Sequence, residues 1–174
     1  MNKILFFKFL NIDMKNAVRI MLLSLCGVFF ISQATAQEVK YKCLLQMSNY
    51  DGLEAYVVVS LIDEKGNYEK TLYMMGPDKQ WYNGFKEWNK KLAKKKENLN
   101  GITGASIAAG DRSITTFTLD EKKFNAGYKL RFESAVEDGA NHIQDVEIPL
   151  TTDDVTKKAE GKGYIRYVKL NKVQ

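Results

Sequence analysis

The fold is decided by one hydrophobic stretch, Glu54-Ala55-Tyr56-Val57-Val58-Val59-Ser60-Leu61-Ile62. Its β-branched and apolar residues favour an extended strand. Because they follow one another with almost no polar alternation, we predict that this strand is central in its sheet. The segments on either side alternate apolar and polar residues, which is typical of half-buried strands.

Working outward from this stretch, six further segments show the period-two alternation of strands: 39–47, 68–75, 113–119, 128–136, 143–150 and 164–170. Turn residues such as Asp63–Asn67 and Phe124–Gly127 separate them. Pro149 predicts an edge position for 143–150, because proline donates no ladder hydrogen bond. Short strands with frequent turns predict a mainly β protein, an antiparallel β-sandwich of immunoglobulin-like type.

One segment changes to helical periodicity. Its large apolar residues fall at i, i+4, i+7 and i+11, namely Trp81, Phe85, Trp88 and Leu92. This spacing predicts one amphipathic helix from about Gln80 to Lys96, inserted in the sandwich, with both indoles in the core. The opposite side is rich in lysine, and we expect it to be a solvated face.

The N-terminal segment has the pattern of a secretory signal peptide. Lys15 and Arg19 precede the apolar run 20–31, and small residues in an A-x-A arrangement end at Ala36. We predict a signal peptide over 1–36, with the true start at Met14, cleavage after Ala36, and a periplasmic or otherwise extracytoplasmic location. Residues 37–174 then form a single β-sandwich domain.

Two other interpretations of this N-terminal segment remain open. The first is a transmembrane anchor, although the apolar run is short for a membrane span. The second is a lipoprotein attached through Cys26, although bulky Leu25 precedes that cysteine.

The basic balance of the chain depends on this segment. The 174 residues contain 26 Lys and Arg against 21 Asp and Glu, a net charge of +5. Cleavage after Ala36 removes four basic residues and one acidic residue, which lowers the net charge to +2. Nucleic-acid-binding domains are strongly basic, so we predict no nucleic-acid partner.

The chain is poor in residues for catalysis or metal binding. Cys43 is alone after loss of Cys26, so no internal disulfide forms, and its apolar neighbours predict a buried, inert thiol. A redox or nucleophilic Cys43 is the less favoured alternative. His142 is the only histidine and has no evident partner for a zinc site or a catalytic triad. We predict neither catalytic side chains nor a metal site.

One glycine-rich segment stands apart, Asn98–Ser106, which contains Thr103-Gly104-Ala105-Ser106. It resembles the acceptor motif Asp-x-x-Ser/Thr-Gly-Ala-Thr/Ser of proteins that receive covalent flavin mononucleotide (FMN) from an ApbE-type flavin transferase. The resemblance implies FMN esterified to Ser106, with Thr103, Gly104, Ala105 and Asn100 as the other cofactor-binding residues. Asn100 stands where the motif has Asp, and Ser106 replaces the commoner Thr.

The motif has a physical rationale. Gly104 and Ala105 keep the backbone beside Ser106 slim enough for a transferase to approach, while Thr103 either orders the turn or contacts the phosphate. The basic run 94–96 could hold the flavin phosphate or guide the transferase. The candidates for stacking on the flavin ring are aromatic residues of the predicted helix: Trp81, Tyr82 and Trp88.

The segments Tyr56–Trp88 and Asn125–Ala135, together with the motif, resemble the predicted periplasmic family called domain of unknown function 2271. Its members often accompany PepSY-type membrane proteins and ApbE-type transferases. The resemblance implies an exported electron-transfer flavoprotein that works with a PepSY-type or other membrane redox protein. The main alternative is a flavin-free periplasmic binding or assembly module. A hydrolase using Ser106 with His142 is a third hypothesis.

Overall fold

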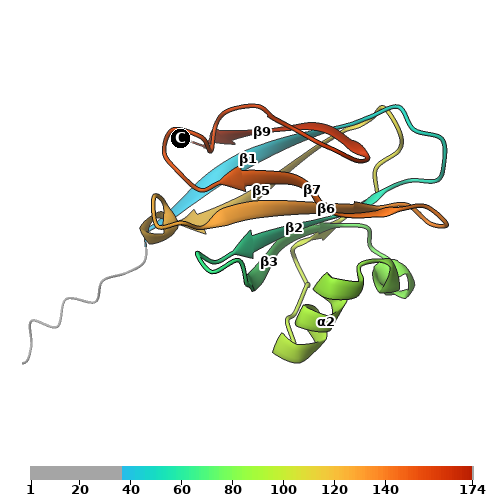
Figure 1. Ribbon diagram of the computed structural model, residues 1–174, viewed down its shortest axis with the longest axis horizontal. Coiled ribbons are helices and arrows are strands. Elements are labelled where there is room, and N and C mark those ends of the chain that lie inside the picture. Colours follow the sequence, from blue (N-terminus) through green and yellow to red (C-terminus); the bar gives the residue numbers. More distant parts are fainter. Residues whose placement is uncertain (1–36, 174) are drawn as a thin grey trace, which may run out of the picture. The chain divides into compact units, whose positions relative to one another are not determined.

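The computed structural model describes residues 37–173, which form a sandwich of two β-sheets (Figure 1). One sheet has the strand order β5-β1-β9-β8, with bounds Arg112–Asp120, Glu38–Met47, Ile165–Lys172 and Ala159–Glu160. The other has the order β4-β3-β2-β6-β7, with bounds Thr103–Gly104, Tyr68–Met75, Tyr56–Ile62, Lys129–Ala135 and Asn141–Pro149. Neighbouring strands are antiparallel, except for the parallel pair β3–β4.

The predicted mainly β sandwich with one helical insertion is therefore confirmed. Pro149 lies on the edge strand β7, as expected. The sequence did not predict β4 and β8, because two residues are too few to show alternation. The predicted signal peptide, its cleavage site and the start at Met14 lie outside the described residues. None of the helices within 37–173 is long and apolar enough to cross a membrane.

The strand order follows an immunoglobulin sandwich with one exchange. If β1 is placed at strand B, then β2, β3, β5, β6 and β7 take the positions C, C′, E, F and G. The place of strand A, beside strand B, is filled by β9, which comes last in the chain.

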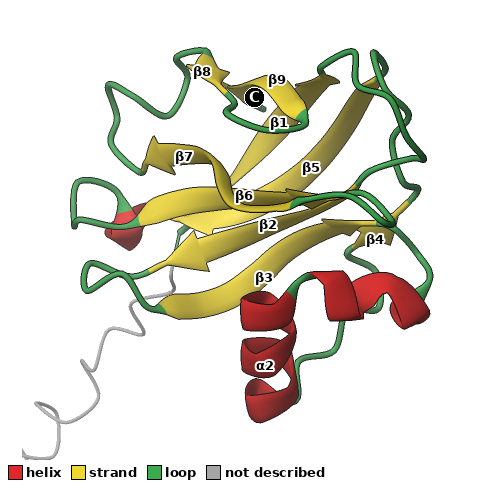
Figure 2. Cartoon of the chain, turned by 45° about the vertical axis from the view of Figure 1, so that its right-hand side comes forward, coloured by secondary structure: helices red, strands yellow, loops and turns green. Residues whose placement is uncertain are grey.

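The central strand β2 is buried on both faces, as predicted. It pairs with β3 on one side and β6 on the other. Val57, Val59 and Leu61 pack into the core between the sheets. Val58 points the other way, into a second cluster that contains Met74, Phe85 and Trp88. Figure 2 shows the helical segment beside the sheet that contains β2 and β3.

The helical segment differs from the prediction of one continuous helix. A 3₁₀-helix, η1 (Lys79–Gly84), is followed by the α-helix α2 (Lys86–Lys95). Phe85 lies between them with φ −92° and ψ 66°, which is not helical. A 3₁₀-helix turns about 120° per residue rather than about 100°, so Trp81 leaves the predicted stripe. Trp88 is in the core as predicted, whereas Trp81 is 38% exposed and that prediction is wrong.

A buried polar network fixes this segment to β3. The indole nitrogen of Trp88 donates to Thr71 Oγ1 at 3.0 Å. The Glu97 carboxylate, beyond the end of α2, accepts from Thr71 N at 3.2 Å and from the Tyr68 hydroxyl. These bonds place the chain after α2 alongside β3, and it then runs on toward Thr103.

Cys43 lies in the core between the sheets and is fully buried. Burial raises the pKa of its thiol to about 12, which keeps the thiol protonated at neutral pH. The prediction of a buried, inert thiol is confirmed.

The buried carboxylate of Asp145 joins the two sheets. It lies on β7 and accepts backbone hydrogen bonds from Lys162, Gly163 and Ile165 at 2.8, 2.7 and 2.9 Å. It also accepts from the hydroxyl of Ser134 on β6, at 2.5 Å. This single side chain therefore ties the connection between β8 and β9 to the opposite sheet.

Replacing Asp145 with alanine should destabilise the fold strongly, because three backbone N–H groups and the buried Ser134 hydroxyl lose a charged acceptor. We expect Asp145→Ala to lower the free energy of unfolding by about 3 kcal/mol or more. Urea denaturation followed by circular dichroism measures this change. The matched control is Asp153→Ala, at an exposed aspartate, which should change it by less than about 0.5 kcal/mol. Equal effects of the two substitutions would contradict the role of Asp145.

Candidate functional site

The segment Thr103–Ser106 lies along the edge of the five-stranded sheet, beside the end of β3. Thr103 and Gly104 form β4, held by hydrogen bonds from Met74 N to Ile102 O and from Gly76 N to Gly104 O, both 2.8 Å. Beyond the motif, Ile107 and Ala55 exchange two backbone bonds of 2.8 and 3.0 Å. Ala105 and Ser106 therefore bridge two anchored points and do not belong to a long free loop.

Ser106 is half-buried, and its hydroxyl donates to the carboxylate of Glu54. Glu54 is exposed and lies two residues before the start of β2. A carboxylate is a strong acceptor for a hydroxyl proton. The Ser106 hydroxyl therefore already has a carboxylate hydrogen-bond acceptor in place.

Ser106 opens into a polar hollow of ≈ 340 Å³. Its charged lining residues are Glu54, Asp111 and Arg112. Arg112 Nε donates to the side-chain oxygen of Gln46. The buried Gln46 amide in turn donates to Gly110 O at 2.7 Å and to Asp111 O at 3.2 Å, which fixes this corner.

Arg112 supplies the hollow with its one basic side chain among the described lining residues. Within 37–173, the hydrogen bond from Nε to Gln46 is the only polar contact of the Arg112 side chain, so its terminal guanidinium nitrogens have no partner. A guanidinium presents several donors in a rigid fork that matches phosphate oxygens. The hollow thus combines a serine hydroxyl with an available phosphate-binding group.

Gly104 is required by the packing of this edge. A side-chain Cβ at this position would overlap the hydroxyl of Tyr73 on β3. Tyr73 also lines the hollow, so Gly104 lets the motif backbone lie directly against this wall.

Thr103 and Asn100 do not line the hollow and have structural roles in the preceding turn. Thr103 Oγ1 donates to Leu99 O at 2.9 Å, so it orders the preceding turn. Asn100 is exposed in that turn, and its backbone N–H donates to Asn98 Oδ1 at 2.9 Å. Of the predicted cofactor-binding residues, Gly104, Ala105 and Ser106 line the hollow, whereas Thr103 and Asn100 do not.

The lysine run of α2 lies at the other end of β3. Lys95 Nζ donates to the carbonyl of Glu69, near the start of β3, whereas Gly104 is paired with Met75 at its end. Six residues of strand separate the two places by roughly 20 Å. The expectation that these lysines hold a phosphate on Ser106 is therefore wrong.

Of the three aromatic candidates for stacking, only Trp81 is accessible. Tyr82 and Trp88 are 4% and 1% exposed. Tyr82 is held in the outer cluster, where its hydroxyl donates to Gly76 O at 3.1 Å.

The hydrolase hypothesis fails on geometry. The Ser106 hydroxyl bonds to Glu54, whereas the His142 ring on β7 packs edge-on against Tyr164, with ring centres 4.9 Å apart. No nucleophile–base pair forms between them. Among the described residues, no three His, Cys, Asp or Glu side chains gather as a metal site.

A second, smaller cavity of ≈ 180 Å³ contains the buried carboxyl group of Glu133, beside Trp88 and Arg131. Glu133 is 4% exposed, and its Oε2 has no hydrogen-bond partner among the described residues. Burial raises the pKa of Glu133 to about 7, opposed by the charge of Arg131 and assisted by that of Glu87. This group therefore titrates near neutral pH.

Sequence analysis missed Glu54, Gln46, Tyr73 and Arg112. They come from four segments of the chain, and no local spacing connects them to the motif. Arg112 stands in a turn-to-strand junction, where an exposed basic residue carries no signal by itself.

The family model described as "Predicted periplasmic protein (DUF2271)" matches residues 38–167. The matched span runs from β1 into β9 and contains the hollow. No curated protein and no solved structure matches the chain.

The packing of Gly104 against Tyr73 can be tested by a double-mutant cycle. Gly104→Ala should destabilise the protein by roughly 1–3 kcal/mol, because its methyl group overlaps the Tyr73 hydroxyl. Tyr73→Phe should recover about 1 kcal/mol of this loss. Urea denaturation of the four proteins measures the coupling. Gly84→Ala is the control, since a Cβ there would meet only Ala135, at 3.9 Å. Additive effects would contradict the contact.

Glu133 should make stability depend on pH. The folded pKa of about 7 lies above the ordinary 4.5, so the folded state binds the extra proton between these values. The free energy of unfolding should fall as pH rises from about 4.5 to beyond 7, by up to about 3 kcal/mol.

Urea denaturation across pH 4 to 9 tests this expectation. Glu133→Gln should remove the fall and exceed the wild type in stability above about pH 7. Glu64→Gln, at an exposed carboxyl group, should leave the wild-type profile unchanged. A Glu133→Gln profile parallel to that of the wild type would show that Glu133 does not titrate in this window.

Proposed function

The chain belongs to the DUF2271 family of predicted periplasmic proteins, and from this premise we propose that it is an exported electron-transfer flavoprotein. In this proposal FMN is esterified to Ser106 by an ApbE-type flavin transferase. Electrons pass between this flavin and a PepSY-type or other membrane redox protein. The flavin supplies the redox chemistry, and the protein holds and orients it.

The observation that carries the proposal is the surroundings of the Ser106 hydroxyl. Its proton is directed to Glu54, and its oxygen opens into a hollow that also contains the Arg112 guanidinium. A phosphate-transfer acceptor needs these three elements: an accessible oxygen, a proton acceptor and a positive charge near the phosphate.

The attachment of FMN to Ser106 can be written as a balanced transfer of a phosphoryl group. The Ser106 oxygen forms a bond to the flavin-side phosphorus of flavin adenine dinucleotide, the bond between the two phosphates breaks, and adenosine monophosphate leaves. Glu54 accepts the hydroxyl proton. The transferase and its magnesium ion would bind the departing nucleotide.

The charged residues of the hollow bear on which form of phosphate it can hold. Glu54 and Asp111 face one basic residue, Arg112, so the hollow suits a phosphodiester with one negative charge better than a phosphate with two. Gly104 and exposed Ala105 have little or no side chain, so they leave space for a transferase to approach Ser106. The residues present therefore fit an esterified FMN.

Outside the hollow, residues 37–173 offer no evident redox group. The single described cysteine is buried, with the pKa of the thiol raised to about 12, and is poorly suited to thiol exchange. Electron transfer by this protein therefore requires a bound cofactor.

Modification of Ser106 is tested by mass spectrometry. The exported chain is produced with and without an ApbE-type transferase, and its intact mass and peptides are measured. We expect a mass increase of one FMN less one water, located on Ser106 and absent from Ser106→Ala. Ser113→Ala is the matched control, because Ser113 lines the same hollow and should leave modification unchanged.

The proposal fails if the chain stays unmodified while the same transferase modifies an established acceptor. A colourless protein whose activity in cells survives Ser106→Ala would instead support the flavin-free binding or assembly module.

A further inference from the structure

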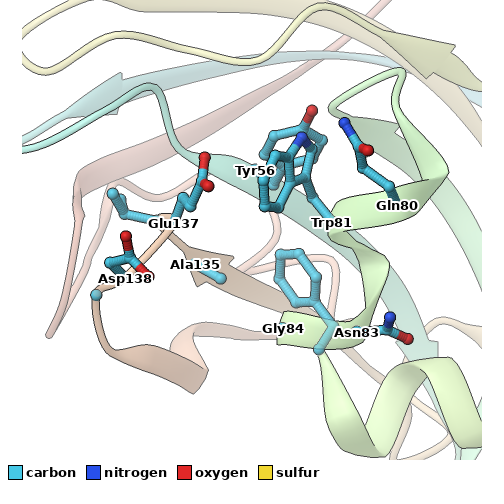
Figure 3. Close-up of a pocket in the computed structure, with 11 residues that line it drawn as sticks. Tyr56, Gln80, Trp81, Asn83, Gly84, Ala135, Glu137 and Asp138 are labelled. Atoms are coloured by element: carbon cyan, nitrogen blue, oxygen red, sulfur yellow. The ribbon is translucent and has the colours of Figure 1, made fainter.

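A groove of ≈ 330 Å³ lies between η1 and the connection from β6 to β7. Figure 3 shows Trp81 and Tyr56 together in one part of this groove, with Glu137 and Asp138 across from them. The remaining wall includes Gln80, Asn83 and the backbone of Gly84.

The aromatic part of the groove presents an accessible ring. Trp81 is 38% exposed, although the other tryptophan of the chain is 1% exposed. The half-buried ring of Tyr56 lies close against the backbone of Gly76, where a Cβ would overlap it. An exposed indole beside a fixed phenol is a surface suited to stacking.

The two walls of the groove are connected. Asn141 Nδ2 donates to the carbonyl of Gly84, which joins the start of β7 to the end of η1. The turn that carries Glu137 and Asp138 is closed by a bond from Gly139 N to Val136 O of 3.0 Å. The acidic and aromatic walls are therefore held at a set separation before any ligand binds.

The charged residues that line the groove give it a negative electrostatic potential. Among the described residues that line it, two are acidic and none is basic. Burial raises the pKa of Tyr56, and the negative charges of Asp78, Glu54 and Glu137 raise it further. A positive group entering the groove would meet attraction from several sides.

We propose that this groove binds an exposed arginine side chain of a partner protein. The planar guanidinium stacks on an indole and pairs with carboxylates at the same time. Lysine satisfies the charge but has no flat face to stack on Trp81. An anionic partner or a lipid phosphate is disfavoured by Glu137 and Asp138.

This partner would bind beside Ser106. Tyr56 of the groove and Glu54 of the hollow are two residues apart, roughly 7 Å along the chain. The proposal does not depend on the flavin, because every residue that it uses is present in the unmodified protein.

The fluorescence of Trp81 measures binding in the groove. The unmodified protein is titrated with N-acetyl-arginine amide while its tryptophan fluorescence is recorded. A second titration uses N-acetyl-citrulline amide, which has the same shape without the charge. The buried Trp88 contributes a constant background. We expect the arginine probe to bind about tenfold more tightly than the citrulline probe. Tetramethylammonium, which is charged but not planar, should bind more weakly than the arginine probe.

Substitutions locate the binding. The double substitution Glu137→Gln with Asp138→Asn should abolish the preference for the charged probe, whereas Glu64→Gln, at an exposed site outside the groove, should preserve it. Trp81→Phe should remove the emission change. Equal binding of the arginine and citrulline probes would overturn the proposal, as would tighter binding of tetramethylammonium or an unchanged preference in the double variant.

Discussion

The structure depends on the burial of β2 on both of its faces. One face packs into the sandwich, and the other must also be covered, because alternating residues of the strand are apolar in both directions. The helical segment supplies this cover through Phe85 and Trp88. Burial on both faces ends near the start of β2, where the chain has Glu54 and Tyr56 instead of buried valines. The hollow and the groove are both found at this end because the two residues remain accessible there.

The edge of the same sheet determines how the motif is presented. An exposed strand edge leaves backbone groups without partners, and β4 covers the end of β3 with two residues. The pairing of Ile107 with Ala55 then returns the chain toward β2. Ser106 is consequently held within reach of Glu54 by backbone bonds on both sides. The site is built on the sheet itself, so its geometry depends little on loop motion.

Much of the fold followed from local sequence patterns, and most of the site did not. The β-branched run at 56–62 predicted a central strand, and the alternation at 68–75 predicted its neighbour. Both patterns can be read locally, because the face of the strand on which a residue lies decides whether it is buried. The break at Phe85 was missed, since the apolar spacing from Trp81 fits an uninterrupted helix equally well. The motif singled out Ser106, but Glu54 and Arg112 come from distant parts of the chain. The bridge between Ala55 and Ile107 places Glu54 beside Ser106, and the pairing of β5 with β1 sets the position of Arg112.

The hollow and the groove differ in their charged groups, since the hollow contains a guanidinium beside two carboxylates and the groove contains carboxylates alone. In the two proposals, Arg112 would contact a phosphate oxygen in the hollow, while Glu137 and Asp138 would contact a cation in the groove. Glu54 of the hollow and Tyr56 of the groove are two residues apart, roughly 7 Å along the chain, which is within a Debye length at physiological salt. Burial raises the pKa of Tyr56, and the charge of Glu54 accordingly raises it further. A phosphodiester on Ser106 would add a negative charge near the groove and strengthen its attraction for a guanidinium. A flavin-loaded chain and an unloaded one would then differ in their affinity for a basic partner, without any change in the fold.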